Sequence, residues 1–400
     1  MKTSSVAAFA LCGLCALRGA SPGPQELHHA AGVINVEVPV RVFDGDRFVG
    51  DLALQDFEVL EDGRPQKIAA LYLIRKGDVQ KEERPAPSAE TPAPKTGRTI
   101  VLQFQITEPD PKLEEAVNFF FDQVLQPEDS LTVITPRATY RFDPEALGRL
   151  PRRDVARQLN DKLRKDILAG AADYRRLLSD IRDIESTPLD PDEKLQMLSE
   201  VYRQLRDRAE ISKPALARMA KALKAREGQK FVFLFYEKEL VKSVSFGNFG
   251  DETLPAEERV LDDMAATELR RIPSVNTKEI ERIFSDASIT VHFIYLTQSK
   301  MNAAGLGVEE LRRDQGRATR DLSPSLFTSF REMAEATGGV SEASANPFAA
   351  FKKAATATEN YYLLYYVPDD YRADGRFKEI EVTVKDKRFR VAHRAGYFAN

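Results

Sequence analysis

The sequence predicts an α/β protein in which a doubly wound, mostly parallel sheet carries an added β-sandwich unit and a helical insertion. Three observations support this fold class. Buried-strand patterns alternate with helical patterns from residue 98 to about residue 358, which is typical of a sheet with helices on both faces. Period-two β patterns flank that region on both sides, and a long helical stretch at residues 144–227 interrupts it.

Length and composition set the first limits. A chain of 400 residues can hold two or three domains. Hydrophobic residues make up 42% and charged residues 30% of the chain, which predicts a globular protein with a substantial core. The formal net charge of -4 gives no electrostatic reason to expect a nucleic-acid partner.

Residues 1–20 predict a secretory signal peptide, because Lys2 precedes an apolar run from Val6 to Leu17. That run is short for a membrane span and no later stretch qualifies, so we expect no transmembrane segment in the mature chain. The expected location is outside the cytoplasm: periplasmic, cell-surface or secreted. Cys12 and Cys15 leave a lipoprotein signal as the alternative, although the residues before them lack the usual Leu-small-small pattern. Cleavage would leave no cysteine, which excludes disulfides and cysteine–zinc sites.

Residues 33–76 predict an N-terminal β unit with an immunoglobulin-like character. Apolar residues alternate from Ile34 to Val42, as in a strand with one buried face. Turns are predicted at Gly45 and at Asp62-Gly63, and an apolar segment from Ile68 to Ile74 adds a further strand. The unit is short for a complete sandwich. Residues 77–97 carry four prolines and predict an extended linker.

Residues 98–358 predict the α/β domain. Thr99 to Phe104 is a nearly continuous apolar run, which suits a strand buried on both faces, and a helix from Pro111 to Leu125 follows. The remaining predicted strands are Asp129–Thr135, Ala138–Phe142, Lys230–Tyr236 and Ile289–Leu296, and the later predicted helices are Leu261–Leu269, Thr277–Ala287, Ser325–Thr337 and Pro347–Thr358.

The helical insertion at residues 144–227 predicts an antiparallel hairpin. Leu195, Leu198, Tyr202 and Leu205 form a short heptad-like stripe that matches the apolar stripe of residues 174–184 in length. Prolines lie between the two stripes, where helices stop. The polar faces of this insertion are either simply solvated or form a surface for a partner.

Residues 359–398 predict three C-terminal strands with one apolar face, formed by Ile380, Val382 and Val384. A sheet with one apolar face must cover it. We therefore expect these strands to pack with the N-terminal β unit as one sandwich, with the α/β domain inserted between them. The alternative is that they extend the edge of the central sheet.

Five motifs follow one another along the chain: Val40-Arg-Val-Phe-Asp, Leu54-Gln-Asp-Phe-Glu-Val-Leu-Glu-Asp-Gly, Glu335-Ala-Thr-Gly-Gly, Tyr361-Tyr-Leu-Leu-Tyr-Tyr-Val-Pro and Arg394-Ala-Gly-Tyr-Phe. Together they resemble the acidobacterial-type VWFA-related domain family of exported proteins, whose central domain is similar to von Willebrand factor type A (VWA) domains. The resemblance implies a VWA/Rossmann-like sheet and, as a class of function, the binding of a protein ligand.

The same resemblance implies a degenerate metal site. VWA domains hold Mg²⁺ through an Asp-x-Ser-x-Ser motif after the first strand, where this chain has Gln105, Thr107 and Pro109. Glu237 follows the next central strand, where the family places an outer ligand. Since Mg²⁺ needs hard oxygen ligands in near-octahedral geometry, we expect no metal and no cofactor. The alternative is a replacement ligand set of Thr107, Glu108, Asp110 and Glu237.

These observations favour an exported, non-enzymatic protein-binding or scaffold module. The alternatives are an assembly or chaperone factor of the cell envelope and a carboxylate-based hydrolase. The sequence contains no Gly-x-Ser-x-Gly elbow, no phosphate-binding loop and no His-Glu-x-x-His motif, so we expect no catalytic residues. His292 lies in an apolar strand and is expected to be a core residue.

Overall fold

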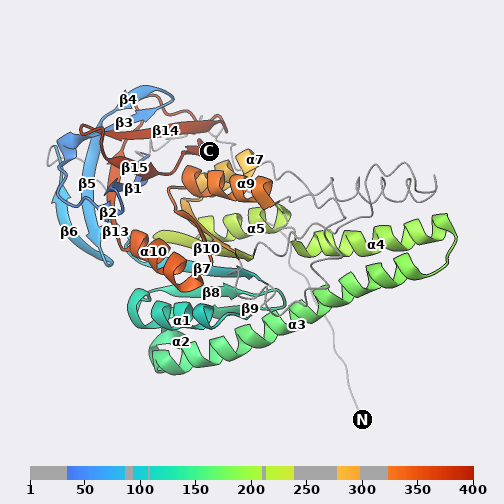
Figure 1. The fold of residues 1–400 in the computed structure, drawn as a ribbon. Coiled ribbons are helices and arrows are strands. Elements are labelled where there is room, and N and C mark those ends of the chain that lie inside the picture. The colour runs from blue at the N-terminus through green and yellow to red at the C-terminus, as the bar shows by residue number, and fades with distance from the viewer. Residues whose placement is uncertain (1–33, 86–92, 107–108, 210–212, 238–276, 298–322) are drawn as a thin grey trace, which may run out of the picture. The chain divides into compact units, whose positions relative to one another are not determined.

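Three β-sheets and the helices around them organise the described part of the chain in the computed structural model (Figure 1). The structure describes residues 34–85, 93–106, 109–209, 213–237, 277–297 and 323–400. The predicted signal peptide at residues 1–20 and the predicted helix Leu261–Leu269 lie outside them. Among the described residues, no helix combines the length and the apolar character needed to cross a membrane.

The central sheet has the strand order β12-β11-β10-β7-β8-β9. All neighbouring strands are parallel except β8 and β9, which confirms a mixed α/β fold with a mostly parallel sheet. The order reverses at β7, which has the next strand in sequence, β8, on one side and β10 on the other. The six strands are β7 (Arg98–Gln105), β8 (Ser130–Ile134), β9 (Thr139–Phe142), β10 (Gln229–Glu237), β11 (Ile289–Leu296) and β12 (Ser341–Ser344).

Helices cover both faces of this sheet, because successive side chains of each strand point to opposite faces. Ile100, Leu102 and Phe104 of β7 pack on one side, whereas Val101 packs on the other. The first side holds α1 (Pro111–Phe119) with its π-helical extension (Phe120–Val124), α2 (Pro144–Arg149), the first half of α3 (Arg152–Ser186) and α10 (Pro347–Glu359). The second side holds α5 (Lys213–Lys224), α7 (Thr277–Asp286) and α9 (Ser323–Ala336).

The helical insertion contains the predicted hairpin. The second half of α3 packs against α4 (Pro191–Ala209) through a separate apolar cluster. Leu177 and Ile181 contribute from α3, and Leu198 and Leu205 contribute from α4. Helix α3 is continuous over 35 residues. Its first half packs in the core of the central domain, and its second half packs in the hairpin.

Strands from both ends of the chain share the two sheets of the β-sandwich. β1 pairs antiparallel with β13 and β15, and β14 pairs antiparallel with β3. Among the described strands, no C-terminal one extends the central sheet. One sheet contains β1 (Val36–Asp44), β2 (Arg47–Phe48), β5 (Ile68–Arg75), β6 (Asp78–Glu83), β13 (Asn360–Tyr366) and β15 (Arg390–His393); the other contains β3 (Phe57–Glu61), β4 (Arg64–Gln66), β14 (Phe377–Val384) and β16 (Gly396–Phe398).

A single apolar core fills the space between the two sandwich sheets. Val36, Val38, Val40 and Val42 of β1 lie in the same cluster as the apolar face of β14, which is Ile380, Val382 and Val384. The apolar faces of the two chain ends therefore cover each other, which is the relationship that their sequence patterns predict.

The expected linker at residues 77–97 needs a correction. Its first part forms β6, an edge strand that pairs with β5. Five of the six residues of β6 are polar, and four of the six are exposed. An edge strand with two polar faces lacks the apolar alternation by which a strand is read from a sequence, so composition alone indicated a linker.

Two of the five sequence motifs, Glu335–Gly339 and Arg394–Phe398, join the sandwich to the central domain. Arg394 Nη2 donates a hydrogen bond of 2.6 Å to the Glu37 carbonyl in β1, and Nη1 donates one of 2.7 Å to Ser288 Oγ after α7. The Ala395 amide donates to the Ala336 carbonyl at 2.8 Å, just before Gly338. Gly338 has a φ of +74°, a conformation that glycine adopts without strain. The final motif is therefore part of a buried contact and not a loose tail.

Candidate functional site

Gln105 and Glu237 end neighbouring strands at the carboxyl edge of the central sheet. Gln105 is the register partner of Tyr236, the residue before Glu237. Glu237 is buried, and Gln105 is half-buried. This edge is where the strand order reverses, the position at which open α/β sheets usually bind ligands. The structure thus brings two of the four predicted site positions together.

The other two predicted positions do not complete a site. Thr107 lies outside the described residues, and Pro109 is exposed. The Asp110 carboxylate accepts a hydrogen bond of 2.7 Å from the Lys112 amide, so it caps α1. A cavity of about 280 Å³ adjoins Pro109 but runs between α1 and α3, and neither Gln105 nor Glu237 lines it.

The described residues contain no group of three or more histidine, cysteine, aspartate or glutamate side chains arranged to hold a metal ion. Of the replacement ligand set, Thr107 and Glu108 lie outside the described residues.

His292 is a core residue, as its strand pattern predicted. Its side chain is fully buried, and its ring stacks on Phe233 with centroids 4.8 Å apart. Nδ1 accepts a hydrogen bond of 3.2 Å from the Val340 amide. Burial is the main cause that lowers the pKa of His292 well below its ordinary value, and the nearby Arg41 charge lowers it further.

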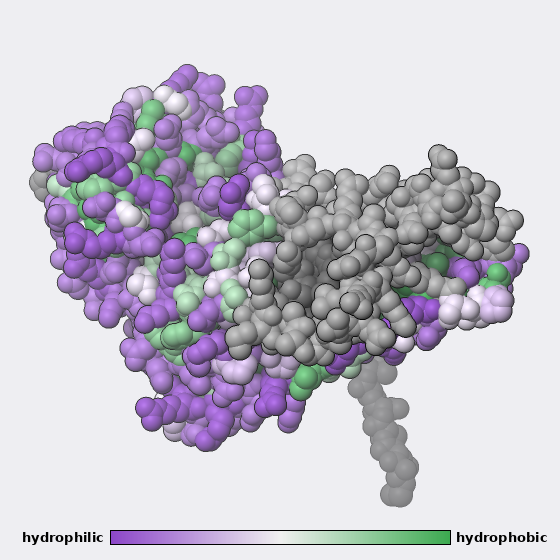
Figure 2. Space-filling model, in the orientation of Figure 1, coloured by the Kyte–Doolittle hydropathy of each residue, from purple (hydrophilic) through white to green (hydrophobic). Residues whose placement is uncertain are grey.

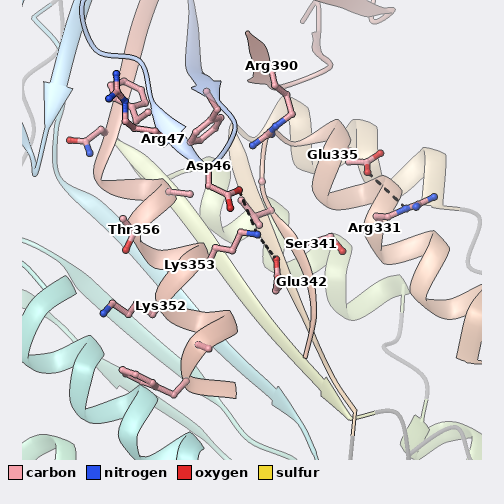
Figure 3. Close-up of a pocket in the computed structure, with 18 of the residues that line it drawn as sticks. Asp46, Arg47, Arg331, Glu335, Ser341, Glu342, Lys352, Lys353, Thr356 and Arg390 are labelled. Atoms are coloured by element: carbon pink, nitrogen blue, oxygen red, sulfur yellow. Dashed lines mark ion pairs between the residues drawn. The ribbon is translucent and has the colours of Figure 1, made fainter. Parts of the chain in front are cut away.

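A larger cavity, which we call the basic cleft, opens at the opposite edge of the sheet between the β1–β2 turn, the amino end of β12 and α10 (Figure 3). Its volume is about 940 Å³. It is lined by Phe43, Asp46, Arg47, Phe48, Arg75, Arg331, Glu335, Gly339, Val340, Ser341, Glu342, Phe348, Ala349, Lys352, Lys353, Thr356, Ala357, Asn360 and Arg390.

Six basic and three acidic residues line the basic cleft, so it carries an excess of three positive charges. Lys353 forms an ion pair with each of two acids, with Nζ 3.1 Å from Glu342 and 3.6 Å from Asp46 (Figure 3). The hydrogen bond to Glu342 is the main cause that raises the pKa of Lys353. Arg331 pairs with the third acid, Glu335, at 3.9 Å.

Four exposed cations of the basic cleft make no ion pair with any described residue. One of them, Arg75, donates a hydrogen bond of 3.2 Å from Nη2 to the Gly50 carbonyl; the other three are Arg47, Lys352 and Arg390. Aromatic rings hold two of them in place. The Arg390 guanidinium lies 4.5 Å from the centroid of the Phe43 ring, and Lys352 Nζ lies 6.0 Å from that of Phe348. Cation–π contacts of this kind position a charge without neutralising it, so these side chains can still bind anionic groups.

Few large hydrophobic residues are exposed in the described part of the chain. Hydrophilic residues cover most of the described surface on the face shown in Figure 2, and hydrophobic ones form small groups. The exposed large hydrophobic residues come from separate stretches of the chain and are Ile34, Val79, Leu150, Leu168, Met197 and Val367. Charge therefore distinguishes the basic cleft from the surrounding surface more clearly than hydropathy does.

Sequence reasoning missed the basic cleft because no local pattern marks it. Its lining residues come from separate stretches between Phe43 and Arg390, and each stretch contributes only a few side chains. The adjacent pair Lys352-Lys353 is the only basic doublet among them, and such doublets are common on helix surfaces.

Two comparisons with known proteins bear on the identity of the chain. Neither the comparison with protein-family models nor the comparison with curated proteins found a match.

Proposed function

We propose that this protein is an exported, non-enzymatic module of the VWFA-related type that binds a protein ligand without a metal ion. The basic cleft is the proposed ligand site, and its ligand is an acidic segment of another protein. One observation carries the proposal: the cleft holds an excess of three positive charges in a chain whose formal net charge is -4. A local charge of this sign attracts and orients a partner of the opposite sign.

The strand order supports the VWA-like part of the proposal. Counted from β7 along the chain, the order β9-β8-β7-β10-β11-β12 corresponds to the 3-2-1-4-5-6 order of doubly wound sheets. The third strand in this count, β9, is short and antiparallel and lies at the edge of the sheet. The proposed export rests on the signal-like pattern of residues 1–20.

The placement of the unpaired cations favours a polypeptide ligand. Arg47 is in β2, Lys352 in α10 and Arg390 in β15, so the free charges come from three different elements around the cleft. A peptide that carries several carboxylates along its length can contact all three. Phe43 and Phe348 offer apolar contacts beside these charges, and aromatic and arginine side chains are enriched at protein interfaces.

The test uses a fluorescein-labelled peptide of about twelve residues that is rich in Asp and Glu, with a Lys-rich peptide for comparison. We expect fluorescence anisotropy to show binding of the acidic peptide alone, weakening as salt rises, and unchanged by Mg²⁺ or by a chelator. The combined variant Arg47→Glu, Lys352→Glu and Arg390→Glu should abolish binding. All three side chains are exposed, and their substitution by glutamate reverses the local charge.

A matched control variant distinguishes an effect of the charges in the cleft from an effect of the net charge of the whole protein. Lys67→Glu, Lys221→Glu and Lys387→Glu combined change the net charge by the same amount, and these exposed residues do not line the cleft. The control should bind the acidic peptide nearly as well as the wild type. Equal loss in both triple variants, or no binding by the wild type, would contradict the proposal.

A further inference from the structure

Arg41 places a buried charge at the contact between the sandwich and the central sheet. Its neighbours Val40 and Val42 point into the sandwich core, so Arg41 points away from it toward the central domain. The residue is only 1% exposed. Its guanidinium carbon lies 5.5 Å from the centroid of the Phe231 ring and 5.7 Å from that of Tyr361.

The guanidinium has few polar partners. Nη1 donates a long hydrogen bond of 3.4 Å to the Gly338 carbonyl, while Nε and Nη2 have no acceptor among the described residues. Burial lowers the pKa of Arg41 to about 10, so the group still carries its charge at neutral pH. Buried charges in proteins are normally paired, and Arg41 makes no ion pair with any described residue.

His292 adds a second unsatisfied donor at the same place. Because Nδ1 accepts from the Val340 amide, the neutral ring carries its proton on Nε2, and Nε2 has no partner. Arg41 and His292 both contact the short segment 338–340: Arg41 contacts Gly338 and His292 contacts Val340. They also share a neighbour, since the Phe231 ring centroid lies 6.2 Å from that of His292.

We propose that a small monovalent anion, chloride, binds between Arg41 and His292. It accepts hydrogen bonds from Arg41 Nε and Nη2 and from His292 Nε2. An anion suits this set of groups better than water does, because all the unsatisfied groups are donors and a water molecule brings two further protons that need acceptors. The anion also supplies the countercharge of Arg41. It thereby stabilises the contact between β1 and the central sheet.

The first test compares thermal unfolding of the full chain in sodium chloride and in sodium gluconate at equal ionic strength. We expect the melting temperature to rise with chloride and to saturate, since a ligand that binds only the folded state stabilises it by mass action. Arg41→Met should abolish the chloride dependence, because it removes the charge but keeps an apolar side chain. Arg149→Met, in the exposed pair with Glu145 outside the basic cleft, is the control and should keep it.

A second measurement does not depend on the folding of a variant. Wild-type crystals grown in sodium bromide should give an anomalous peak within hydrogen-bonding distance of Arg41 Nε, Arg41 Nη2 and His292 Nε2. Water density without an anomalous peak would overturn the proposal, and so would identical melting curves in the two salts. The acidic-peptide experiment leaves Arg41 untouched, so either proposal can fail without the other.

Discussion

The Tyr366 hydroxyl donates a hydrogen bond of 2.6 Å to Glu61 Oε2 inside the sandwich and so joins its two sheets. The same carboxylate oxygen accepts a second bond, 2.9 Å long, from the Tyr397 hydroxyl. Burial is the main cause that raises the pKa of Tyr366, and the hydrogen bond to Glu61 raises it further. Strands β3, β13 and β16 thus meet at one buried carboxylate, which receives two donors in place of water.

Tyr366→Phe should lower the free energy of unfolding by about 1–3 kcal/mol, because the buried Glu61 carboxylate loses one of its two hydroxyl donors. Urea unfolding at neutral pH measures the change. The control is Tyr371→Phe, whose hydroxyl bonds the exposed Asn400 carbonyl and whose loss should change stability by less than about 0.5 kcal/mol. Equal effects in the two variants would show that the Glu61 contact does not stabilise the sandwich.

Leu198→Ala should cost about 2–5 kcal/mol if the α3–α4 hairpin has a packed core. Leu198 is 5% exposed and lies in the hairpin cluster, whereas its neighbour Met197 is 42% exposed. Met197→Ala is therefore a control of similar side-chain size on the same helix turn, and it should be nearly neutral. Chemical denaturation followed by circular dichroism compares the two, and similar losses would mean that the hairpin does not pack as described.

Arg98 and Asp129 form a buried, bidentate ion pair at the amino end of β7. Arg98 Nε donates to Asp129 Oδ1 at 2.9 Å and Nη2 donates to Oδ2 at 2.5 Å, and the two side chains are 3% and 1% exposed. Asp129→Ala should cost about 3–5 kcal/mol, because it leaves the Arg98 charge buried without its partner. The double variant Arg98→Met with Asp129→Ala should recover part of this loss in urea unfolding. A strictly additive double variant would argue against a coupled pair.

Stability should fall as the pH drops below about 6.5, in part through His393. Burial lowers the pKa of His393 below its ordinary value of 6.5. The ring is fixed as neutral, since Nδ1 lies 2.9 Å from the Arg394 carbonyl and Nε2 accepts from the Val382 amide at 3.2 Å. At a pH between the pKa of His393 in the folded chain and its pKa in the unfolded chain, the unfolded chain binds a proton that the folded chain does not. The free energy of unfolding therefore falls by up to about 1.4 kcal/mol for each unit by which the pH drops.

His393→Gln isolates this contribution, because the other histidines remain. Urea unfolding of both proteins between about pH 7 and pH 5.5 should show a shallower loss of stability in the variant. Parallel pH profiles would mean that His393 titrates with the same pKa in the folded and unfolded states.

Sequence patterns predicted the elements that have strong periodicity. The alternating valines of β1 and the apolar face of β14 led to the shared sandwich, and the stripe that contains Leu198 led to the hairpin. Weak patterns failed: β6 is an exposed polar edge strand, and β12 is the four-residue segment Ser-Glu-Ala-Ser. Such short segments form strands because they pair with neighbouring strands, and their own residues show no clear strand pattern.

The candidate site was harder to predict than the fold. The family resemblance identified Gln105 and Glu237 as metal-site positions, and the two residues lie together because they end neighbouring parallel strands. The basic cleft depends on tertiary folding, which brings β2, α10 and β15 together from distant parts of the sequence. Single lysines and arginines carry no information about such neighbours until the fold is known.

The position of β1 between β13 and β15 has a consequence for how the chain acquires its structure. A chain that emerges amino end first exposes β1 long before residues 360–393, which form its two long neighbours, have been made. Until then the one described strand beside β1 is the two-residue β2, and the apolar valines of β1 lack the opposing face of β14. Contacts between such distant segments close slowly. The central sheet can therefore form while the sandwich is still open, and its closure is expected to be the last folding event.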